Sequence, residues 1–167
     1  MASSLLFSGK LLVILVVLVS TFAIGTMANK ETTNWNWWPY RNHNASQPKK
    51  VVVGGSENWH FGFNYTDWAL KNGPFYLGDT LVFKYDPPNG TTTFPHSVYL
   101  LPHYWSFLKC DLKWARKIAD VNQGGGEGFE FVLRWWQPYY FACGERNGFH
   151  CQNGTMKFPV MPLIHWD

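Results

Sequence analysis

The segment from Tyr139 to Val160 decides the fold, because two apolar runs flank a single turn-rich loop. The first run is Tyr139-Tyr140-Phe141-Ala142, the loop starts at Cys143, and the second run is Met156-Lys157-Phe158-Pro159-Val160. Short apolar runs bounded by glycine, asparagine and similar residues are typical of β-strands. The segment therefore predicts strands at 139–142 and 156–160, connected by a loop.

The rest of the chain repeats this pattern of short apolar runs and turns. A short helix is expected at 66–71, with Thr66 as its N-cap and Asn72-Gly73 at its end, and another within 104–120. Further strands are predicted at 50–53, 80–85, 97–101 and 129–133, of which 80–85 shows the clearest alternation. Many short strands separated by turns predict an all-β fold, an antiparallel sandwich or barrel.

Composition indicates a folded domain and argues against two classes of function. Aromatic residues make up 19% of the 167 residues and charged residues 15%, against about 25% charged in an average soluble protein. The net charge is only +3 and the basic residues are scattered, so we expect no nucleic-acid partner. Motifs of metalloproteases and serine hydrolases are absent, and the Gly124–Gly128 loop lacks the Lys-Ser/Thr of a phosphate-binding loop. We therefore expect that the protein is not an enzyme.

Residues 1–28 have the pattern of a secretory signal peptide. Lys10 precedes an apolar run from Leu11 to about Ile24, and Thr26 and Ala28 fit the small-residue positions of a cleavage site. The run is short for a membrane span of about 20 residues, and a retained signal anchor is the alternative. The C-terminal tail, 162–167, carries no GPI-anchor pattern. We expect a secreted, extracellular protein, with association to the plasma membrane left open.

Asparagine sequons agree with export to an oxidising compartment. They occur at Asn44, Asn64, Asn89 and Asn153, each followed two residues later by Ser or Thr. Each sequon is a weak motif alone, but together with the signal they predict a glycoprotein.

Residues 29–49 form a tryptophan-rich N-terminal extension without periodicity, and the domain is expected to span 50–161. Trp35, Trp37 and Trp38 have two interpretations. Their rings either pack onto the sandwich, which we favour, or form an exposed platform that contacts a cell-wall polysaccharide.

Three cysteines are an odd number for an exported protein, so one thiol needs a separate role. Cys143, His150 and Met156 cluster around the loop of the deciding segment, and His96 begins another predicted strand. Two imidazoles, one thiolate and a weakly bound Met are the ligands of a type 1 (blue) copper site, because this mixture suits both Cu(I) and Cu(II). The sequence therefore predicts one mononuclear copper ion.

The order and spacing of several motifs resemble the plant phytocyanins, a family of blue copper proteins with the cupredoxin fold. The resemblance covers about residues 50–161. It is carried by Val53-Gly54-Gly55-Ser56 with Trp59, Tyr65-Thr66-Asp67-Trp68-Ala69, residues 75–85, His96-Ser97-Val98, residues 139–143, and His150-Cys151 with Met156-Lys157. It implies a Greek-key β-sandwich with one or two short helices.

Matched residue by residue, the resemblance makes His96, Cys143, His150 and Met156 the copper ligands and pairs Cys110 with Cys151 in a disulfide. It implies a secreted, apoplastic carrier of single electrons, expected to be a monomer, with a redox partner that the sequence does not identify. The alternative is a copper-free cell-wall or cell-surface glycoprotein that binds through the same fold. His43, His60, His103 and His165 fall outside the ligand pattern, and we expect ordinary polar or surface roles for them.

The sequence departs from the family pattern at two places in the ligand loop. Six residues separate Cys143 from His150, more than most members have, and Thr155 adds one residue before Met156. A shift of one residue in an extended segment turns a side chain to the opposite face. Met156 is therefore either an axial ligand, with Gly154 absorbing the insertion in a bulge, or a core residue that faces away from the metal.

Overall fold

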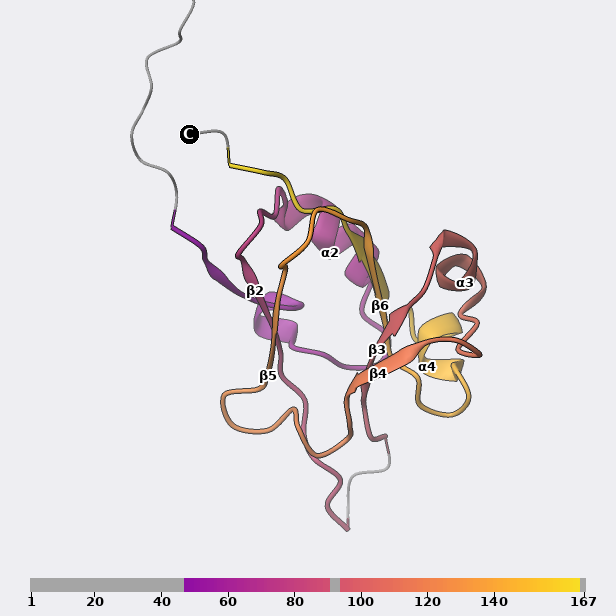
Figure 1. The fold of residues 1–167 in the computed structure, drawn as a ribbon. Helices are drawn as coiled ribbons and strands as arrows, with labels where there is room; N and C mark the ends of the chain where they lie inside the picture. The colour runs from indigo at the N-terminus through magenta and orange to yellow at the C-terminus, as the bar shows by residue number, and fades with distance from the viewer. Residues whose placement is uncertain (1–46, 91–93, 166–167) are drawn as a thin grey trace, which may run out of the picture. The chain divides into compact units, whose positions relative to one another are not determined.

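The computed structural model describes residues 47–90 and 94–165, all of which lie in the compact unit Asn42–Asp167 (Figure 1). The predicted signal peptide, the tryptophans at 35, 37 and 38, His43 and the sequon at Asn44 lie outside the described residues. No helix within the described ranges is long and apolar enough to cross a membrane.

Two β-sheets form the domain, as the sequence predicts. The strands are β1 (Lys50–Val52), β2 (Thr80–Phe83), β3 (Val98–Leu101), β4 (Arg116–Ala119), β5 (Phe129–Val132), β6 (Tyr139–Ala142) and β7 (Lys157–Val160). One sheet has the order β1-β2-β5 and the other the order β4-β3-β6-β7.

One strand pair differs from the predicted antiparallel arrangement. Strand β1 pairs with β2 in parallel, with Val51 opposite Leu81, whereas the other pairs are antiparallel. Parallel neighbours need a crossover connection, and here the chain passes through a 3₁₀ turn at Gly55–Glu57 and through helix α2 (Tyr65–Asn72) before it enters β2. The prediction was wrong for this pair because apolar runs do not show strand direction.

Strand β4 lies in the region for which only a short helix was expected. Its sequence, Arg116-Lys117-Ile118-Ala119, gives two exposed basic residues and only one fully buried side chain. It is an edge strand of its sheet, where exposed Lys and Arg side chains protect the open edge from other chains. Such a strand lacks the apolar alternation on which its prediction depends.

The core lies between the two sheets and is built largely of aromatic rings. Phe83 on β2 packs against Phe141 on β6, with ring centroids 5.4 Å apart, and Phe141 packs against Phe158 on β7 at 5.1 Å. Trp59 is fully buried, meets the edge of Phe83, and donates a hydrogen bond from Nε1 to the carbonyl oxygen of Ser97. These contacts join both sheets to the segment that leads into β3.

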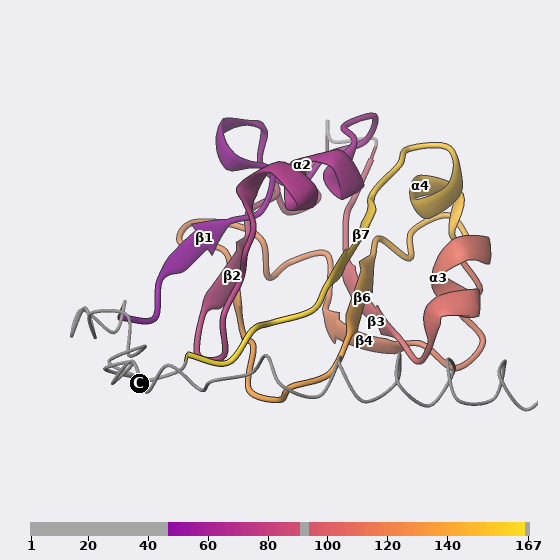
Figure 2. The same ribbon diagram turned by 90° about the horizontal axis from the view of Figure 1, so that it is seen from above.

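The N-cap of helix α2 lies two residues earlier than predicted. Its N-cap is Asn64, whose side chain accepts a hydrogen bond from the backbone N–H of Asp67, and Gly73 follows its last turn as expected. Thr66, the predicted cap, lies inside the first turn and donates from Oγ1 to the carbonyl oxygen of Lys157 on β7. Both residue types are good N-caps, so sequence preference alone does not separate them. Figure 2 shows α2 packed against β7.

The described residues contain more helix than the one or two short helices expected. Besides α2 and the 3₁₀ turn there are α3 (Tyr104–Lys109) and α4 (Phe149–Gln152). Helix α4 lies in the ligand loop and follows Gly148, which has a positive φ and makes no side-chain cap. Figures 1 and 2 both place α3 and α4 next to each other, beside the second sheet.

The residues after β7 pack onto the domain rather than leaving it at once. The backbone N–H of Leu163 donates to the carbonyl oxygen of Phe75, and the N–H of Leu77 donates back to Leu163. The ring of His165 stacks on Tyr76 at 4.2 Å. This contact explains one histidine outside the ligand pattern as a packing residue.

Candidate metal centre

Three predicted ligands come together from three separate segments. His96 lies just before β3, Cys143 directly follows β6, and His150 is on α4. Because β3 and β6 are hydrogen-bonded neighbours, the segments at these ends of the two strands meet. His96, Cys143 and His150 are all buried, and their ligand atoms all lie within 4.8 Å of one another.

The distances fit a single metal ion bound by all three side chains. Cys143 Sγ lies 3.5 Å from Nδ1 of His150 and 3.9 Å from Nδ1 of His96. An ion bonded to nitrogen at about 2.0 Å and to sulfur at about 2.3 Å, with trigonal angles, holds each nitrogen about 3.7 Å from the sulfur. The site therefore fits a small transition-metal ion without rearrangement of the sheet.

Burial keeps the metal-free histidines neutral. It lowers the pKa of His96 to about 4, with further lowering by the neighbouring positive charge of a protonated His150. Burial also lowers the pKa of His150, and Arg146 acts in the same direction. Near neutral pH both rings are therefore uncharged and offer a lone pair to a metal, as ligation requires.

The pKa of the Cys143 thiol is shifted in the opposite direction. Burial raises the pKa of Cys143 to about 11, although backbone hydrogen bonds from Ser97 and Glu145 to the sulfur lower it in part. The thiol is thus protonated near neutral pH, and a metal ion has to displace its proton. Those two N–H groups are placed to stabilise the thiolate once it forms.

Three phenylalanine rings cover the side of the centre on which His150 lies. Phe61 meets the ring of His150 edge-on at 5.3 Å, and the rings of Phe94 and Phe149 each lie 6.4 Å from it. Phe61 stacks on Phe149 at 5.7 Å and on Phe94 at 6.5 Å. We call Phe61, Phe94 and Phe149 the phenylalanine cover. Beneath it His150 is fully buried, and its Nε2 has no hydrogen-bond partner among the described residues.

The side on which His96 lies is open to a cavity. A cavity of about 380 Å³, here named the His96 cavity, is lined by His96 itself and by residues of four nearby segments. Its lining residues are Glu57, Asn58, Trp59, His60, Lys84, Tyr85, Asp86, Phe94, His96 and Gly124, Gly125 and Gly126. The two histidines of the centre therefore differ in what covers them.

Met156 is fully buried and belongs to the same core cluster as Cys143. The residue with a left-handed backbone in this segment is Thr155 and not Gly154. Thr155 has a φ of 53°, a left-handed conformation that is rare for a β-branched residue, and its hydroxyl donates to the carbonyl oxygen of Phe63. Gly154 does not have a positive φ. Glycine is required there for space, because a Cβ would lie 2.5 Å from the ring of Phe61.

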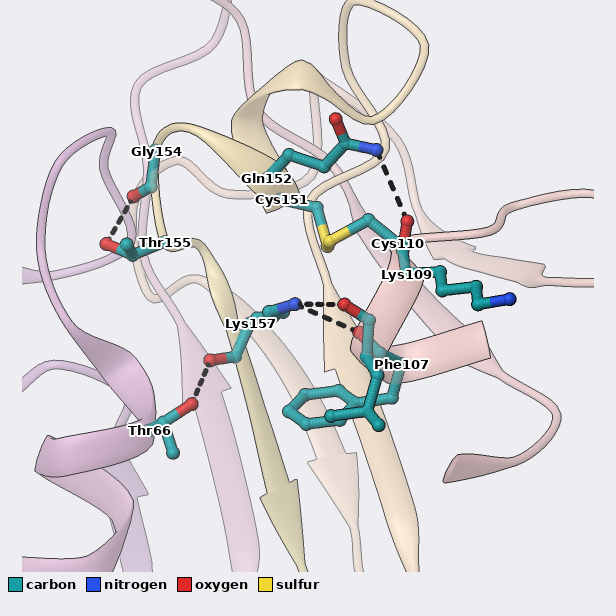
Figure 3. The surroundings of a disulfide bond; sticks show 10 residues. Thr66, Phe107, Lys109, Cys110, Cys151, Gln152, Gly154, Thr155 and Lys157 are labelled. Carbon is teal, nitrogen blue, oxygen red and sulfur yellow. Dashed lines mark hydrogen bonds between the residues drawn. A yellow bond between two sulfur atoms is a disulfide. The ribbon is translucent and has the colours of Figure 1, made fainter. Parts of the chain in front are cut away.

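A disulfide joins Cys110 and Cys151, with Cα atoms 5.8 Å apart, and Cys143 is a free, buried thiol. Cys110 ends α3 and Cys151 lies on α4, directly after His150 (Figure 3). Figure 3 also shows Lys157, whose Nζ donates to the carbonyl oxygens of Phe107 and Leu108 at the end of α3. The disulfide ties the helix that carries His150 to α3, and the bonds of Lys157 tie β7 to the same helix.

Two further histidines have structural partners. The ring of His103 accepts a hydrogen bond from the N–H of Ser106 and caps α3, and His60 Nδ1 lies 2.7 Å from the carbonyl oxygen of Glu57. The phenylalanine cover was not predicted from the sequence. Its members come from three distant segments, and a lone Phe in a sequence most often indicates a core position.

No family model matches the chain, but individual proteins do. Two proteins of Medicago truncatula, "Blue copper protein 1a" and "Blue copper protein 1b", are each 27% identical to it over 113 residues, which are 67% of this chain. The matched region spans 60% of the length of each of these relatives.

Solved structures of the same kind match the fold. A structure titled "Cucumber basic protein, a blue copper protein" is 29% identical and superposes with a TM-score of 0.52, covering 68% of this chain and 99% of that chain. Cucumber stellacyanin, 23% identical with a TM-score of 0.54, covers 71% of this chain and 97% of its own and supports the fold alone.

The cupredoxin sandwich and the buried His-Cys-His cluster are the features of a type 1 copper protein. The site fits one copper ion. Within this class, the relatives and the solved structures support a plant phytocyanin.

Proposed function

We propose that the protein is a secreted electron carrier in which His96, Cys143 and His150 bind one type 1 copper ion and Met156 is its axial ligand. The observation that carries this proposal is the buried cluster of two neutral imidazoles and one free thiol, with all ligand atoms within 4.8 Å. Bound copper would supply a Cu(I)/Cu(II) couple that exchanges one electron at a time.

The surroundings of the cluster suit electron exchange rather than bond-making chemistry. His150 lies on α4, which the adjacent disulfide holds in place, and Cys143 directly follows β6 of the four-stranded sheet. A ligand set held on rigid elements changes little in geometry when the charge of the ion changes, which favours transfer of single electrons. We propose an electron carrier rather than an enzyme, because the similar proteins are named blue copper proteins.

The axial role of Met156 rests on burial and on backbone geometry. Its side chain is fully buried in the cluster that contains Cys143, and its backbone carbonyl accepts a hydrogen bond from the N–H of Cys143. The left-handed residue before it, Thr155, redirects the chain and so offsets the insertion. A thioether in this place would give the weak fourth ligand of a type 1 site.

Export is supported by the signal pattern of residues 1–28 and by the disulfide, since disulfides persist mainly in oxidising compartments. Asn64, Asn89 and Asn153 are exposed, as glycosylated residues must be. Asn64 caps α2 through its side-chain oxygen, which leaves its amide nitrogen for a glycan. We propose an apoplastic, monomeric glycoprotein; contact of Trp35, Trp37 and Trp38 with wall polysaccharide stays a hypothesis.

Copper titration of four forms of the protein tests the ligand assignment. The wild-type chain should bind one equivalent of copper, and His96→Ala and His150→Ala should each weaken retention at least tenfold against a competing chelator. His60→Ala is the matched control, because His60 lies near the centre but outside the cluster, and it should retain copper. Equal retention by all four forms would exclude these histidines as ligands.

A further inference from the structure

The two histidines of the centre differ in accessibility, and this difference limits where a small molecule can approach. On the side of His150, the phenylalanine cover places three rings within 6.4 Å of the imidazole. Arg146 lies over the ring of Phe94 at 4.8 Å, which helps hold that ring in place. No small molecule can contact His150 without displacing these rings.

On the side of His96, by contrast, the imidazole forms part of the wall of a cavity. The volume of about 380 Å³ lies at the small end of the range of about 300–1,000 Å³ that is usual for ligand sites. The cavity therefore suits a molecule of one or two rings. Such a molecule would contact His96 directly, and only the imidazole of His96 would separate it from the sulfur of Cys143.

The glycine-rich loop at 124–126 forms one wall of this cavity. The proposed electron-carrying function gives this loop no other role. Gly124 lies flat on the ring of Tyr85, and any Cβ at this position would collide with that ring. The N–H of Tyr85 donates to the carbonyl oxygen of Gly124, which fixes the loop in place. Without side chains on residues 124–126, the space beside His96 stays unfilled.

The lining combines an apolar ring with acidic hydrogen-bond acceptors and a basic hydrogen-bond donor. Phe94, 48% exposed, adds the apolar surface of its ring to this lining, which an aromatic ligand can contact. Glu57 and Asp86 accept hydrogen bonds, and Lys84 donates them. Two acidic groups against one basic group disfavour an anionic ligand, whereas an uncharged hydroxyl can both donate to a carboxylate and accept from the lysine.

We propose that the His96 cavity binds small uncharged hydroxylated aromatic molecules, phenols and quinols, against the imidazole of His96. This inference deepens the proposed function, because it names the class of molecule that would exchange electrons with the centre and the histidine through which it would do so. Binding itself requires no metal, so it can be tested separately from copper chemistry.

Titration of the metal-free protein with hydroquinone under anaerobic conditions, followed by ¹H–¹⁵N NMR, tests the proposal. Saturable shifts are expected for the backbone signals of His96 and Gly124–Gly126, while those of Phe61 and Phe149 should stay unchanged. Benzoate, which has the same ring and a negative charge, should bind at least tenfold more weakly.

Two variants fill the cavity, and one matched control does not. Lys84→Trp and Glu57→Trp should each raise the dissociation constant for hydroquinone at least tenfold, and either one suffices if the other does not fold. Lys113→Trp, on an exposed lysine outside the cavity, should bind like the wild type. The proposal is overturned by shifts that centre on Phe61 and Phe149, by the absence of saturable shifts in the wild type, or by unchanged binding in the filled variants. Loss of the blue copper spectrum would overturn the proposed function and leave this binding result standing.

Discussion

The backbone N–H of Cys143 donates a 2.9 Å hydrogen bond to the carbonyl oxygen of Met156. This bond continues the pairing of β6 with β7 by one step beyond Ala142 and Lys157. In the same segment, the N–H of Met156 donates to the carbonyl oxygen of His150 at 3.1 Å. The ends of the ligand loop are thus tied together before any metal binds, so we expect the metal-free protein to hold a nearly complete site.

Gly154→Ala should destabilise the protein by about 1–3 kcal/mol, the usual cost of overpacking a filled site. The new Cβ would lie 2.5 Å from the ring of Phe61 and 2.6 Å from the carbonyl oxygen of His150. Urea unfolding of the metal-free protein measures the effect. Gly90→Ala is the matched control, since nothing lies within 4 Å of a Cβ there. Equal unfolding midpoints for the two variants would contradict the packing described for the phenylalanine cover.

The stability of the metal-free protein should fall as the pH drops from 6.5 toward 4. Burial lowers the pKa of His96 from 6.5 to about 4, so between these values the unfolded chain binds more protons than the folded chain. Since each pKa unit is worth about 1.4 kcal/mol, the loss amounts to about 3 kcal/mol. Urea unfolding at pH 7 and pH 4 measures it, with His96→Gln as the control. If the variant loses as much stability as the wild type, other groups such as His150 or the carboxylates, rather than His96, cause the change.

Copper binding near pH 7.5 should release about one proton per ion. The pKa of Cys143 is raised to about 11, so its thiol must give up a proton, whereas the histidines are already neutral. Calorimetric titrations in two buffers with different heats of ionisation count the protons. Release of no proton would mean that Cys143 is not a ligand, and release of two or more would mean that a histidine is charged before binding.

Met156→Gln should lower the reduction potential, because a harder axial oxygen favours Cu(II) over Cu(I). Voltammetry of the copper-loaded protein measures the change, and Met161→Gln, on an exposed methionine just after β7, is the matched control. An unchanged potential with a stability loss of about 1–3 kcal/mol would show that Met156 is only a core residue. Deletion of Thr155 complements this test, and a large change in the spectrum would show that the native site depends on the insertion.

The strands could be predicted well because apolar runs and turn residues mark them directly. The run at 139–142 has the bounds of β6, and Cys143 and His150 stand out because they share one short loop. Strand β4 could not be predicted, since Arg116 and Lys117 face solvent at a sheet edge and leave no alternating pattern. The parallel pairing of β1 with β2 depends on the path of the chain between them, which composition does not show.

The surroundings of the centre were harder to predict than its ligands. Phe61, Phe94 and Phe149 lie in three segments separated by more than thirty residues, and only tertiary packing brings their rings over His150. The backbone conformation of the inserted residue was also hard to predict, for a local reason. Glycine is the residue that usually adopts a positive φ, yet here Thr155 does so, and its hydroxyl donates to the carbonyl oxygen of Phe63.

The absorption spectrum of the copper-loaded protein, compared with that of Cys143→Ser, tests the central claim most directly. A thiolate bound to Cu(II) gives an intense charge-transfer band toward the red end of the spectrum, and Cys143 is the free thiol of the described residues. If Cys143 binds the copper, this band is present in the wild type and in Met161→Gln and is completely lost in Cys143→Ser. A wild-type protein that binds one copper ion without the band, or a Cys143→Ser variant that keeps it, would contradict the account.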